Sequence, residues 1–343
     1  MKKTRVLIVD DSIFFRKFLA DRLSALPHIE IAGFAINGFE AKHAIPQLKP
    51  DVVTLDVEMP GMSGTETLNY IMTNYPVPVV IVSAVNFNVF DALSAGAVDF
   101  VKKPDANVPG AAEKFISELA DKISIAKNAH LRKHTAAPAA APVFPQPQSL
   151  QPLRPLIIAL GASTGGTEAT LTVLKDLPKS TPGMVIVQHM PAGFTKMYAD
   201  RLNGLCQMEV REAKDGDAVT PGLALIAPGD KQMEVYKIGA GYSVKCYQGE
   251  KVSGHCPSVD VLFSSVAAAA GKDAVGIIMT GMGKDGADGL LKMRNNGAFT
   301  IGQDKESSVV YGMPMVAYDI GAVTKQTSCE NIAPTLRAYL NKL

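Results

Sequence analysis

The sequence predicts an α/β fold in two domains, each built on a doubly wound parallel sheet, with an antiparallel hairpin in the second. Three observations predict it. Short apolar strand runs alternate with helical stretches in both halves of the chain. A segment rich in proline and alanine separates the halves. The length of 343 residues suffices for two domains that each bury a core.

Five strand–helix units make up the first half, which we predict to be a domain over residues 1–125. The strand runs are Val6–Val9, Ile29–Ala35, Val52–Leu55, Val77–Val82 and Asp99–Val101. The helical stretches are Ile13–Ala25, Gly38–Leu48, Gly64–Asn74, Val89–Ala95 and Ala111–Ala126. This alternation indicates five parallel strands covered by helices on both faces. Ligands of such sheets bind at the carboxyl ends of the strands.

Prolines interrupt the chain between the two halves. From His134 to Pro155 the sequence reads HTAAPAAAPVFPQPQSLQPLRP. Repeated proline blocks both helices and sheet ladders, so we expect a semi-stiff, exposed linker. We place the linker at residues 126–154 and the second domain at residues 155–343.

The second half repeats the strand–helix alternation. The expected strands are Leu156–Leu160, Met184–Val187 and Ala274–Met279, and the expected helices are Thr167–Leu177 and Val259–Ala270. Within Met233–Tyr247, the runs MEVYKI and YSVKCY flank a glycine-containing turn. That pattern predicts an antiparallel hairpin inserted in a doubly wound domain.

The composition indicates a globular protein and excludes several classes of partner. Apolar residues make up 47% and charged residues 20%, and the net charge of +1 gives no basis for binding nucleic acid or acidic lipid. The N-terminal MKKTRVLIVDDS has too short an apolar run for a signal peptide. Nowhere do about 18 apolar residues run together, as a membrane span requires. We expect a cytoplasmic monomer that is not inserted in a membrane.

The cysteines show no spacing typical of a metal site or a redox motif. Cys206, Cys246, Cys256 and Cys329 are scattered over the second half, and we expect reduced thiols. His255 precedes Cys256, but two adjacent residues without further ligands are weak support for a metal.

Charged and polar side chains follow the strands of the first domain. Asp10 and Asp11 end the first strand and Asp56 follows the third, so we expect these carboxylates to share one pocket. Three carboxylates repel one another without a cation, and Mg²⁺ suits oxygen ligands. Ser83 ends the fourth strand and Lys103 follows the fifth. These parts suit phosphoryl transfer onto Asp56, although each aspartate alone could be a cap or loop residue.

The segments LIVDDS, LDVEMPGMSG, IVSA and DFVKKP resemble the receiver domains of two-component response regulators. The resemblance covers nearly the whole first domain and implies a flavodoxin-like receiver fold, phosphorylated on Asp56. It implies that Mg²⁺, required for this phosphorylation, is held by Asp11, Asp56 and the backbone carbonyl of Glu58, with Asp10 in the same shell. Ser83 and Lys103 would contact the phosphoryl group. Phe100 stands at the position of the family's aromatic switch residue.

A glycine-flanked serine follows the first strand of the second domain. Gly161-Ala-Ser163-Thr-Gly165 satisfies G-x-S-x-G between a strand and a helix, the context of a nucleophile elbow. Two other interpretations remain open: a phosphate cradle at a helix N-terminus, or a serine that only caps the helix. The motif matches neither G-x-G-x-x-G nor the P-loop, which argues against a nucleotide site.

A histidine and an aspartate follow two further strands of this domain. His189 ends VIVQHMP and is a candidate general base for Ser163. Asp285 lies in TGMGKDG, where it could orient His189 or simply cap a helix. We expect the backbone amides of Gly281, Gly283 and Gly286 to be free for an oxyanion. Ser163, His189 and Asp285 each have a structural interpretation when they are considered alone.

The segments IALGASTGG, VIVQHMPAGFT, APGD, CPSVDVLFSSVA, IIMTGMGKDGADGL and SSVVYGMP resemble the CheB family of chemotaxis response regulators. The resemblance covers nearly the whole chain. It implies Ser163 as nucleophile, His189 as base and Asp285 as its orienting partner, with no cofactor for hydrolysis. The implied activity is protein-glutamate methylesterase and protein-glutamine deamidase. The implied partners are methyl-accepting chemotaxis receptors as substrates and a chemotaxis histidine kinase as phosphodonor.

A receiver with a non-catalytic output is the competing class of function. A DNA-binding output would need a basic recognition helix, and none is apparent in residues 155–343. A scaffold would have no use for Ser163, His189 and Asp285 together. A nucleotide-binding domain would be recognised by a nucleotide-dependent thermal shift.

Overall fold

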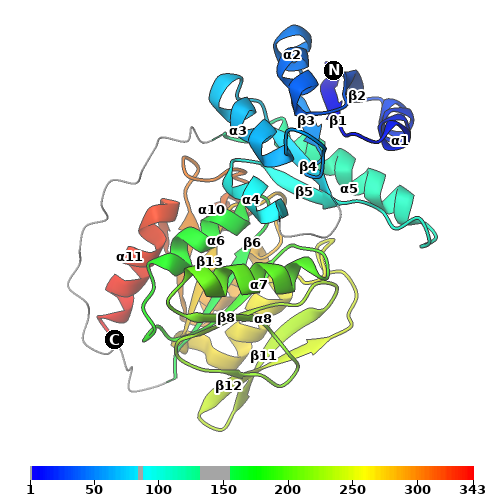
Figure 1. Ribbon diagram of the computed structural model, residues 1–343. Coiled ribbons are helices and arrows are strands. Elements are labelled where there is room, and N and C mark those ends of the chain that lie inside the picture. Colours follow the sequence, from blue (N-terminus) through cyan, green and yellow to red (C-terminus); the bar gives the residue numbers. More distant parts are fainter. Residues whose placement is uncertain (1, 84–87, 132–154) are drawn as a thin grey trace. The chain divides into compact units, whose positions relative to one another are not determined.

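The computed structural model describes residues 2–83, 88–131 and 155–343 (Figure 1). The chain divides into two compact units, residues 1–141 and 142–343. The proline-rich linker predicted from His134 to Pro155 lies outside the described residues except for Pro155.

The first unit is a five-stranded sheet in the order β2-β1-β3-β4-β5. Its strands are β1 (Thr4–Val9), β2 (Ile29–Ala35), β3 (Val52–Leu55), β4 (Val79–Ser83) and β5 (Asp99–Lys102). All neighbouring strands are parallel. The predicted five-stranded parallel fold is confirmed, and β1 and β3 are direct neighbours.

Helices cover the first sheet in two groups. They are α1 (Ile13–Ser24), α2 (Gly38–Leu48), α3 (Gly64–Asn74), α4 (Asn88–Ser94) and α5 (Ala111–Ala126). Helix α1 contacts α5, while α3 contacts both α2 and α4. The sheet is therefore covered on both faces, as parallel strands with apolar side chains on both sides require.

Local chemistry fixes several boundaries in the first unit. The Ser12 hydroxyl accepts a hydrogen bond from the Phe15 amide and caps α1. Ser63 and Glu66 form a reciprocal capping box at the start of α3. Strand β4 begins at Val79, two residues later than predicted, because Pro78 has no amide hydrogen to donate to the ladder.

The second unit contains a seven-stranded sheet in the order β15-β14-β13-β6-β7-β10-β8, with all neighbours parallel. Its strands are β6 (Ile157–Ala162), β7 (Gly183–Gln188), β8 (Glu209–Glu212), β10 (Leu223–Ile226), β13 (Ala274–Ile278), β14 (Phe299–Gln303) and β15 (Lys325–Thr327). The predicted doubly wound domain is confirmed. Strands β8, β10, β14 and β15 were not predicted from the sequence.

The helices of the second unit also lie in two groups. They are α6 (Gly166–Lys175), α7 (Phe194–Leu205), α8 (Val259–Ala270), the 3₁₀ turn η1 (Gly271–Asp273), α9 (Ala287–Asn295), α10 (Met313–Asp319) and α11 (Cys329–Leu340). Helix α9 packs against α8 and α10, while α6 packs against α7 and α11. The sequence predicted α6 and α8 with bounds, and a helix after Asp285, where α9 lies, but it did not predict α7, α10 or α11.

The predicted hairpin is confirmed and belongs to a small antiparallel sheet. Strands β11 (Gln232–Ile238) and β12 (Gly241–Tyr247) pair along their whole length, and β9 (Ala218–Val219) adds a third strand. Gly239 at the turn has a φ of 54°, which glycine adopts without steric cost. Strand β11 packs against α8.

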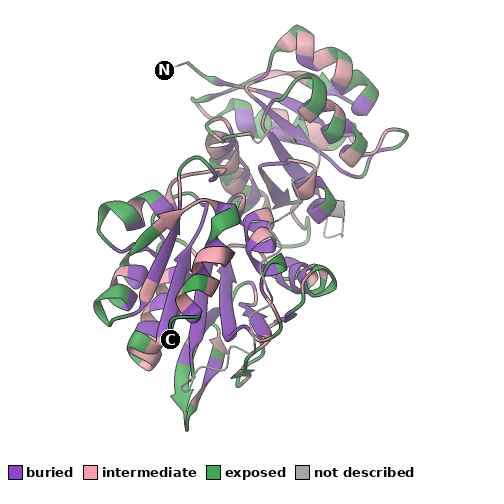
Figure 2. Cartoon of the chain, turned by 90° about the vertical axis from the view of Figure 1, so that its left-hand side faces the viewer, coloured by how far each residue is buried: buried purple, intermediate pink, exposed green. Residues whose placement is uncertain are grey.

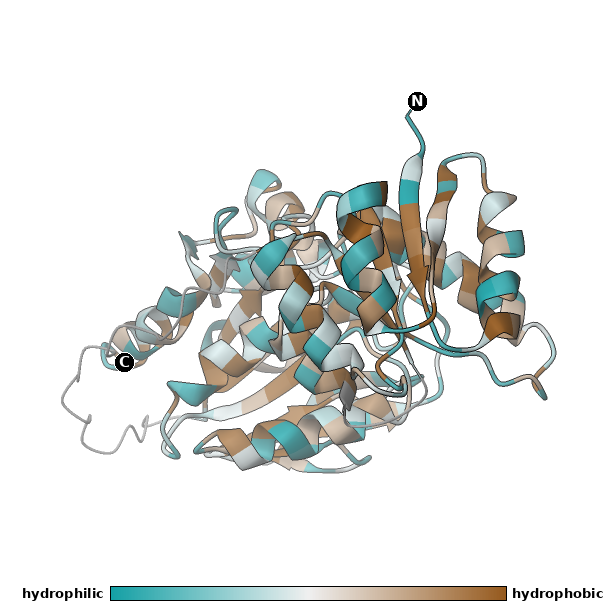
Figure 3. Cartoon of the chain, turned by 45° about the horizontal axis from the view of Figure 1, so that its top comes forward, coloured by the Kyte–Doolittle hydropathy of each residue, from teal (hydrophilic) through white to brown (hydrophobic). Residues whose placement is uncertain are grey.

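The core of each unit lies between its sheet and its helices. Figure 2 shows the central strands of both parallel sheets as buried, and Figure 3 shows strands of these sheets as largely hydrophobic. In α8, Val259, Leu262, Phe263 and Val266 are fully buried at the spacing of one helix face, which explains why this helix was predictable. Among the described residues, no helix combines the length and the apolar character that crossing a membrane would demand.

Candidate functional site

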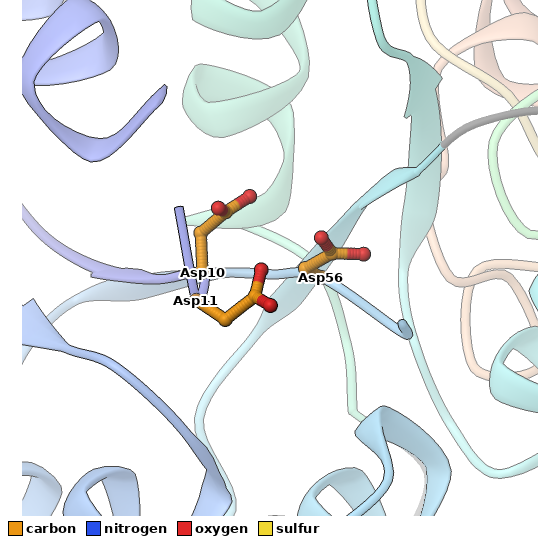
Figure 4. A group of neighbouring side chains, drawn as sticks. All are labelled: Asp10, Asp11 and Asp56. Carbon is orange, nitrogen blue, oxygen red and sulfur yellow. The ribbon is translucent and has the colours of Figure 1, made fainter. Parts of the chain in front are cut away.

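Three carboxylates meet at the carboxyl edge of the first sheet (Figure 4). Asp10 and Asp11 follow β1, and Asp56 follows the adjacent strand β3. One oxygen from each carboxylate lies within 4.8 Å of the oxygens from the other two. Asp10 and Asp56 are buried, whereas Asp11 is exposed. The structure thus brings together the three aspartates that the sequence singled out.

Lys103 joins two of these carboxylates. Its Nζ lies 2.8 Å from Asp10 Oδ2 and 2.5 Å from Asp56 Oδ2. Burial alone would lower the pKa of Lys103, but its hydrogen bonds to the two carboxylates outweigh burial and raise it. Burial raises the pKa of Asp10 in spite of the ion pair with Lys103. With one lysine against three carboxylates, the pocket keeps an excess of negative charge by count.

The oxygen atoms of this pocket fit a magnesium ion. Mg²⁺ binds through one or two carboxylates and retains waters and phosphate oxygens as its other ligands. Exposed Asp11 is accessible to a hydrated ion, while Asp56 is held by the Glu58 amide, which donates to Asp56 Oδ1 at 3.0 Å. This bond places the backbone of Glu58 beside Asp56, where its carbonyl is the remaining candidate ligand.

Ser83 and Phe100 lie on the neighbouring strands β4 and β5. The Ser83 hydroxyl is buried and has no hydrogen-bond partner in the described part of the chain. The Ser83 carbonyl accepts a 2.8 Å hydrogen bond from the Lys103 amide. A buried hydroxyl without a partner is costly, so Ser83 is suited to contact a phosphoryl oxygen. Phe100 is buried beneath Lys122, whose Nζ lies 5.2 Å from the ring centroid.

Ser163 follows β6 at the turn into α6. Its amide donates to the Thr280 carbonyl (3.0 Å), and its carbonyl accepts from Gln188 Nε2 (2.8 Å). Gly165 has a φ of 76°, in the left-handed region that other residues adopt only with strain. The turn is therefore anchored to the ends of both neighbouring strands, and the glycine two residues on allows its tight geometry.

His189 and Asp285 form a hydrogen-bonded pair. His189 Nε2 lies 2.8 Å from Asp285 Oδ2, and the His189 amide donates to Ala162 O at 3.1 Å across the β6–β7 ladder. Both side chains are nearly enclosed, with exposed fractions of 8% and 1%. The structure thus brings His189 to the strand end next to Ser163 and joins it to the predicted orienting carboxylate.

The N-terminus of α8 holds Asp285. Ser258 Oγ and the Val259 amide each donate to its carboxylate at 2.7 Å, and the Asp260 amide donates at 3.1 Å. Burial alone would raise the pKa of Asp285, but the bonds from His189, Ser258 and Val259 outweigh burial and hold it below its usual value. Asp285 is therefore a fixed anion and not a simple cap of α9, whose N-cap is Gly286.

The other ring nitrogen of His189 is available for a proton. His189 Nδ1 is buried and has no hydrogen-bond partner within the described residues, so it is not bonded to Ser163 here. With Nε2–H donating to Asp285, Nδ1 is the basic nitrogen. Catalytic contacts are often loose in a protein without substrate and tighten in the complex.

Not all of the glycine amides that we expected to be free for an oxyanion are free. The amides of Gly281 and Gly286 are not free, because Gly281 donates to Val310 O and Gly286 donates to the Asp260 carboxylate. Of the expected glycines, Gly283 remains, with no hydrogen bond from its amide within the described chain. The Met282 amide is likewise unpaired among the described residues, and sequence reasoning missed it.

This loop lies directly against the serine. A Cβ added to Gly281 would lie 2.7 Å from Ser163 Cβ. The amides of Met282 and Gly283, the next two residues of the loop, are therefore near Ser163. The glycines drew attention to this loop in the sequence, but only the backbone fold shows which of its amides already have hydrogen-bond partners.

A second histidine lies at the site and was considered in the sequence only as a weak metal ligand. The His255 ring stacks on the His189 ring, with centroids 3.7 Å apart and planes inclined by 10°. In the described residues, the one cluster of His, Cys, Asp and Glu side chains that could hold a metal is the Asp10, Asp11 and Asp56 group. Sequence reasoning had no signal for the stack, because a loop rather than a strand places His255.

Comparison with known proteins gives matches to both units. A family described as "CheB methylesterase" matches residues 158–336, and one described as "Response regulator receiver domain" matches residues 6–108. A relative from Syntrophomonas wolfei named "Protein-glutamate methylesterase/protein-glutamine glutaminase 2" is 52% identical over 343 residues, covering 100% of this chain and 99% of the relative. A "Protein-glutamate methylesterase/protein-glutamine glutaminase" from Salmonella choleraesuis is 44% identical, covering 99% of this chain and 98% of that relative.

A solved structure matches the second unit. The crystal structure of the Thermotoga maritima CheB methylesterase catalytic domain covers 55% of this chain and 98% of its own, with 33% identity and a TM-score of 0.53.

Proposed function

The chain belongs to the CheB methylesterase family, and on this premise we propose that it is a phosphorylation-activated serine esterase. Its substrates are γ-methyl esters of glutamate on methyl-accepting chemotaxis receptors, and it also deamidates glutamine side chains there. The observation that carries the proposal is the buried His189–Asp285 pair at the strand end next to Ser163.

Each step of ester cleavage is assigned to one of the groups at or beside the Ser163 turn. As Ser163 Oγ attacks the γ-carbonyl carbon of the ester, His189 Nδ1 takes the hydroxyl proton and the carbonyl π electrons move to oxygen. Asp285 stabilises the imidazolium through its bond to Nε2–H. The amides of Met282 and Gly283 are the candidate donors to the oxyanion.

The intermediate then collapses and expels methoxide, which takes the proton from His189 and leaves as methanol. Water attacks the glutamyl-enzyme ester, giving its proton to His189. Collapse of this second intermediate frees glutamate and returns the proton to Ser163. With a glutamine side chain the first leaving group is ammonia, and the later steps are the same.

The first unit supplies regulation. Asp56 accepts a phosphoryl group, and a bound Mg²⁺ would neutralise charge on the phosphoryl oxygens during transfer. Asp10, Asp11, Asp56 and the Glu58 carbonyl would hold that ion, while Ser83 and Lys103 would contact the phosphoryl group. The receiver domain implies a histidine kinase as phosphodonor. The reaction takes place in the cytoplasm, on the cytoplasmic part of receptors.

The test is release of labelled methanol from receptor membranes whose glutamates carry radioactive methyl esters. Ser163→Ala should reduce release at least about a thousandfold, because loss of a triad member removes nucleophilic catalysis. Ser180→Ala is the matched control, since this half-buried serine lies in a loop before β7, and it should act as the wild type does. Substantial release by Ser163→Ala would refute the covalent route.

A further inference from the structure

The stack of two histidine rings is not required by the triad. Asp285 already holds one ring nitrogen of His189, and the β6–β7 ladder holds its backbone. Nevertheless His255 lies face to face with the ring at 3.7 Å and 10°. Contact this close and this parallel covers one whole face of the base.

His255 is itself held in place by its own loop and by β11. His255 and Val252 exchange backbone hydrogen bonds of 2.9 and 3.0 Å. Gln232, fully buried on β11, donates from Nε2 to the His255 carbonyl (3.3 Å) and accepts at Oε1 from the Ser258 amide (2.9 Å). Gln232 thus ties the loop that carries His255 to the helix start that holds Asp285.

The single bond to Asp285 leaves one degree of freedom in the His189 ring. With the backbone and Nε2 both held, the ring can still tilt about the line from Cβ to Nε2, which would move Nδ1 away from the proton of Ser163. A flat partner against one face restricts this tilt. It also offers an aromatic face to the imidazolium that forms when His189 takes the proton.

We propose that His255 is a positioning residue for catalysis, whose stacked ring fixes the plane of the His189 imidazole so that Nδ1 stays aligned with Ser163. This rests on the proposed roles of Ser163 and His189. It predicts that the rate of reaction at Ser163 depends on the shape and flatness of the side chain at position 255 and not on its nitrogen atoms.

The experiment uses diisopropyl fluorophosphate, which bonds through phosphorus to an activated serine oxygen and releases fluoride. The full-length protein and its variants are inactivated over a range of reagent concentrations, giving the maximal rate constant and the apparent binding constant. His255→Ala should lower the maximal rate constant about tenfold with the binding constant unchanged, because the base is present but poorly aligned.

Two replacements of similar bulk separate stacking from packing. His255→Phe keeps a flat ring and should restore the rate to within about threefold of the wild type, whereas His255→Leu fills the space without a ring and should stay about tenfold slow. Lys251→Ala, an exposed change in the same loop, is the matched control and should leave both constants unchanged. Melting temperatures of all variants show whether folding is retained.

Equal maximal rate constants for His255→Phe and His255→Leu, whether fast or slow, would overturn the proposal. So would a His255→Ala variant in which only the binding constant for the reagent is weakened. The reagent reacts with no receptor, so an error in the proposed substrate would leave these rates unchanged. Failure of the wild type to react at all would instead overturn the proposed function, and with it the role of His255.

Discussion

At the scale of single residues, the direction of the His189–Asp285 bond decides how the triad works. The bond uses Nε2, so the proton acceptor is Nδ1, and Asp285 is fixed by three donors from the start of α8. A carboxylate with this many donors is both an orienting group and a structural anchor. Its replacement should therefore affect rate and stability together.

Asp285→Asn should lower the maximal rate of ester hydrolysis by about a thousandfold or more, because an amide can hold the wrong imidazole tautomer and cannot support the imidazolium. The variant also leaves one donor of α8 facing an amide nitrogen, which should reduce the free energy of unfolding by about 1–3 kcal/mol. Rate and denaturant midpoint are measured on the same samples. Asp288→Asn, an exposed change on α9, should alter neither.

The pKa of Asp285 also sets a pH dependence of stability. Because its folded pKa lies below the unfolded value, its charge stabilises the fold at pH values above the usual aspartate pKa of about 3.9. This contribution is lost as the pH falls through the lower, folded pKa. The difference in melting temperature between wild type and Asp285→Asn should be constant from pH 7 to about 5 and shrink below about 4. A difference that grows with acidification would contradict the direction of the shift.

In the first unit, we expect phosphorylation to take place on Asp56. Acetyl phosphate with magnesium chloride should add one phosphoryl group, which is detected as a mass increase and is removed by hydroxylamine, as an acyl phosphate is. Asp56→Asn should abolish it, because Asp56 is the buried carboxylate that both Lys103 and the Glu58 amide hold in the pocket. Asp121→Asn, an exposed change on α5, is the control. Full labelling of Asp56→Asn at the wild-type rate would contradict the assignment.

At the scale of elements, the α8–α9 contact depends on the absence of a side chain. A Cβ on Gly289 would lie 2.7 Å from Phe263 Cβ and 3.1 Å from the Asp260 carbonyl. Gly289→Ala should therefore lower the free energy of unfolding by about 1–3 kcal/mol, as overpacking does. It should also slow hydrolysis, because Asp260 belongs to the helix start that holds Asp285.

Gly204→Ala is the matched control for this prediction. Gly204 lies within α7, and nothing lies within 4 Å of an added Cβ. The substitution should stabilise the protein by about 0.5–1 kcal/mol through helix propensity. Denaturant unfolding of both variants measures the contrast, and a stabilised Gly289→Ala would show that α8 and α9 can separate without cost.

The sequence predicted elements where local pattern and packing agree. Helix α8 has a regular apolar face and a serine cap, and it was predicted with its observed bounds. Strand β15, with the three polar residues KQT, has no apolar pattern of its own and exists through pairing with β14. Strand β10 is an apolar run, LALI, but its four residues are too few to tell a buried strand from another buried segment. Helix α11 was not predicted. It contains Pro334, and a proline within a segment argues against a helix.

The same distinction applies to the candidate site. Ser163, His189 and Asp285 are marked in the sequence because each follows an apolar strand run. Met282 and His255 are not marked, because their roles depend on which amides the loop leaves unpaired and on where a loop places a ring. Strand ends are predictable from sequence, whereas the conformations of loops are set by long-range contacts.

At the scale of the whole molecule, two units with separate cores are joined by a proline-rich segment. Such a tether keeps two domains at high effective concentration without fixing their contact. We expect the unphosphorylated receiver to restrict access of receptors to Ser163 and phosphorylation of Asp56 to weaken that restriction. A change of about 1.4 kcal/mol between two states alters their ratio tenfold.

The fragment comprising residues 155–343 should therefore hydrolyse receptor methyl esters several-fold faster than the unphosphorylated full-length protein. With diisopropyl fluorophosphate, whose small size avoids any restriction on receptors, fragment and full-length protein should react at similar rates. A fragment no faster on receptors than the whole chain would show that the receiver acts by positive activation or by delivery to receptors.

The most direct measurement of the central claim is methanol release from methyl-labelled receptor membranes by the full-length protein, with and without acetyl phosphate and magnesium. The account predicts that the phosphodonor raises the rate at least about tenfold in the wild type and not in Asp56→Asn, and that Ser163→Ala releases almost nothing in either condition. Equal rates with and without phosphodonor, or an unchanged response in Asp56→Asn, would contradict a serine esterase controlled through Asp56.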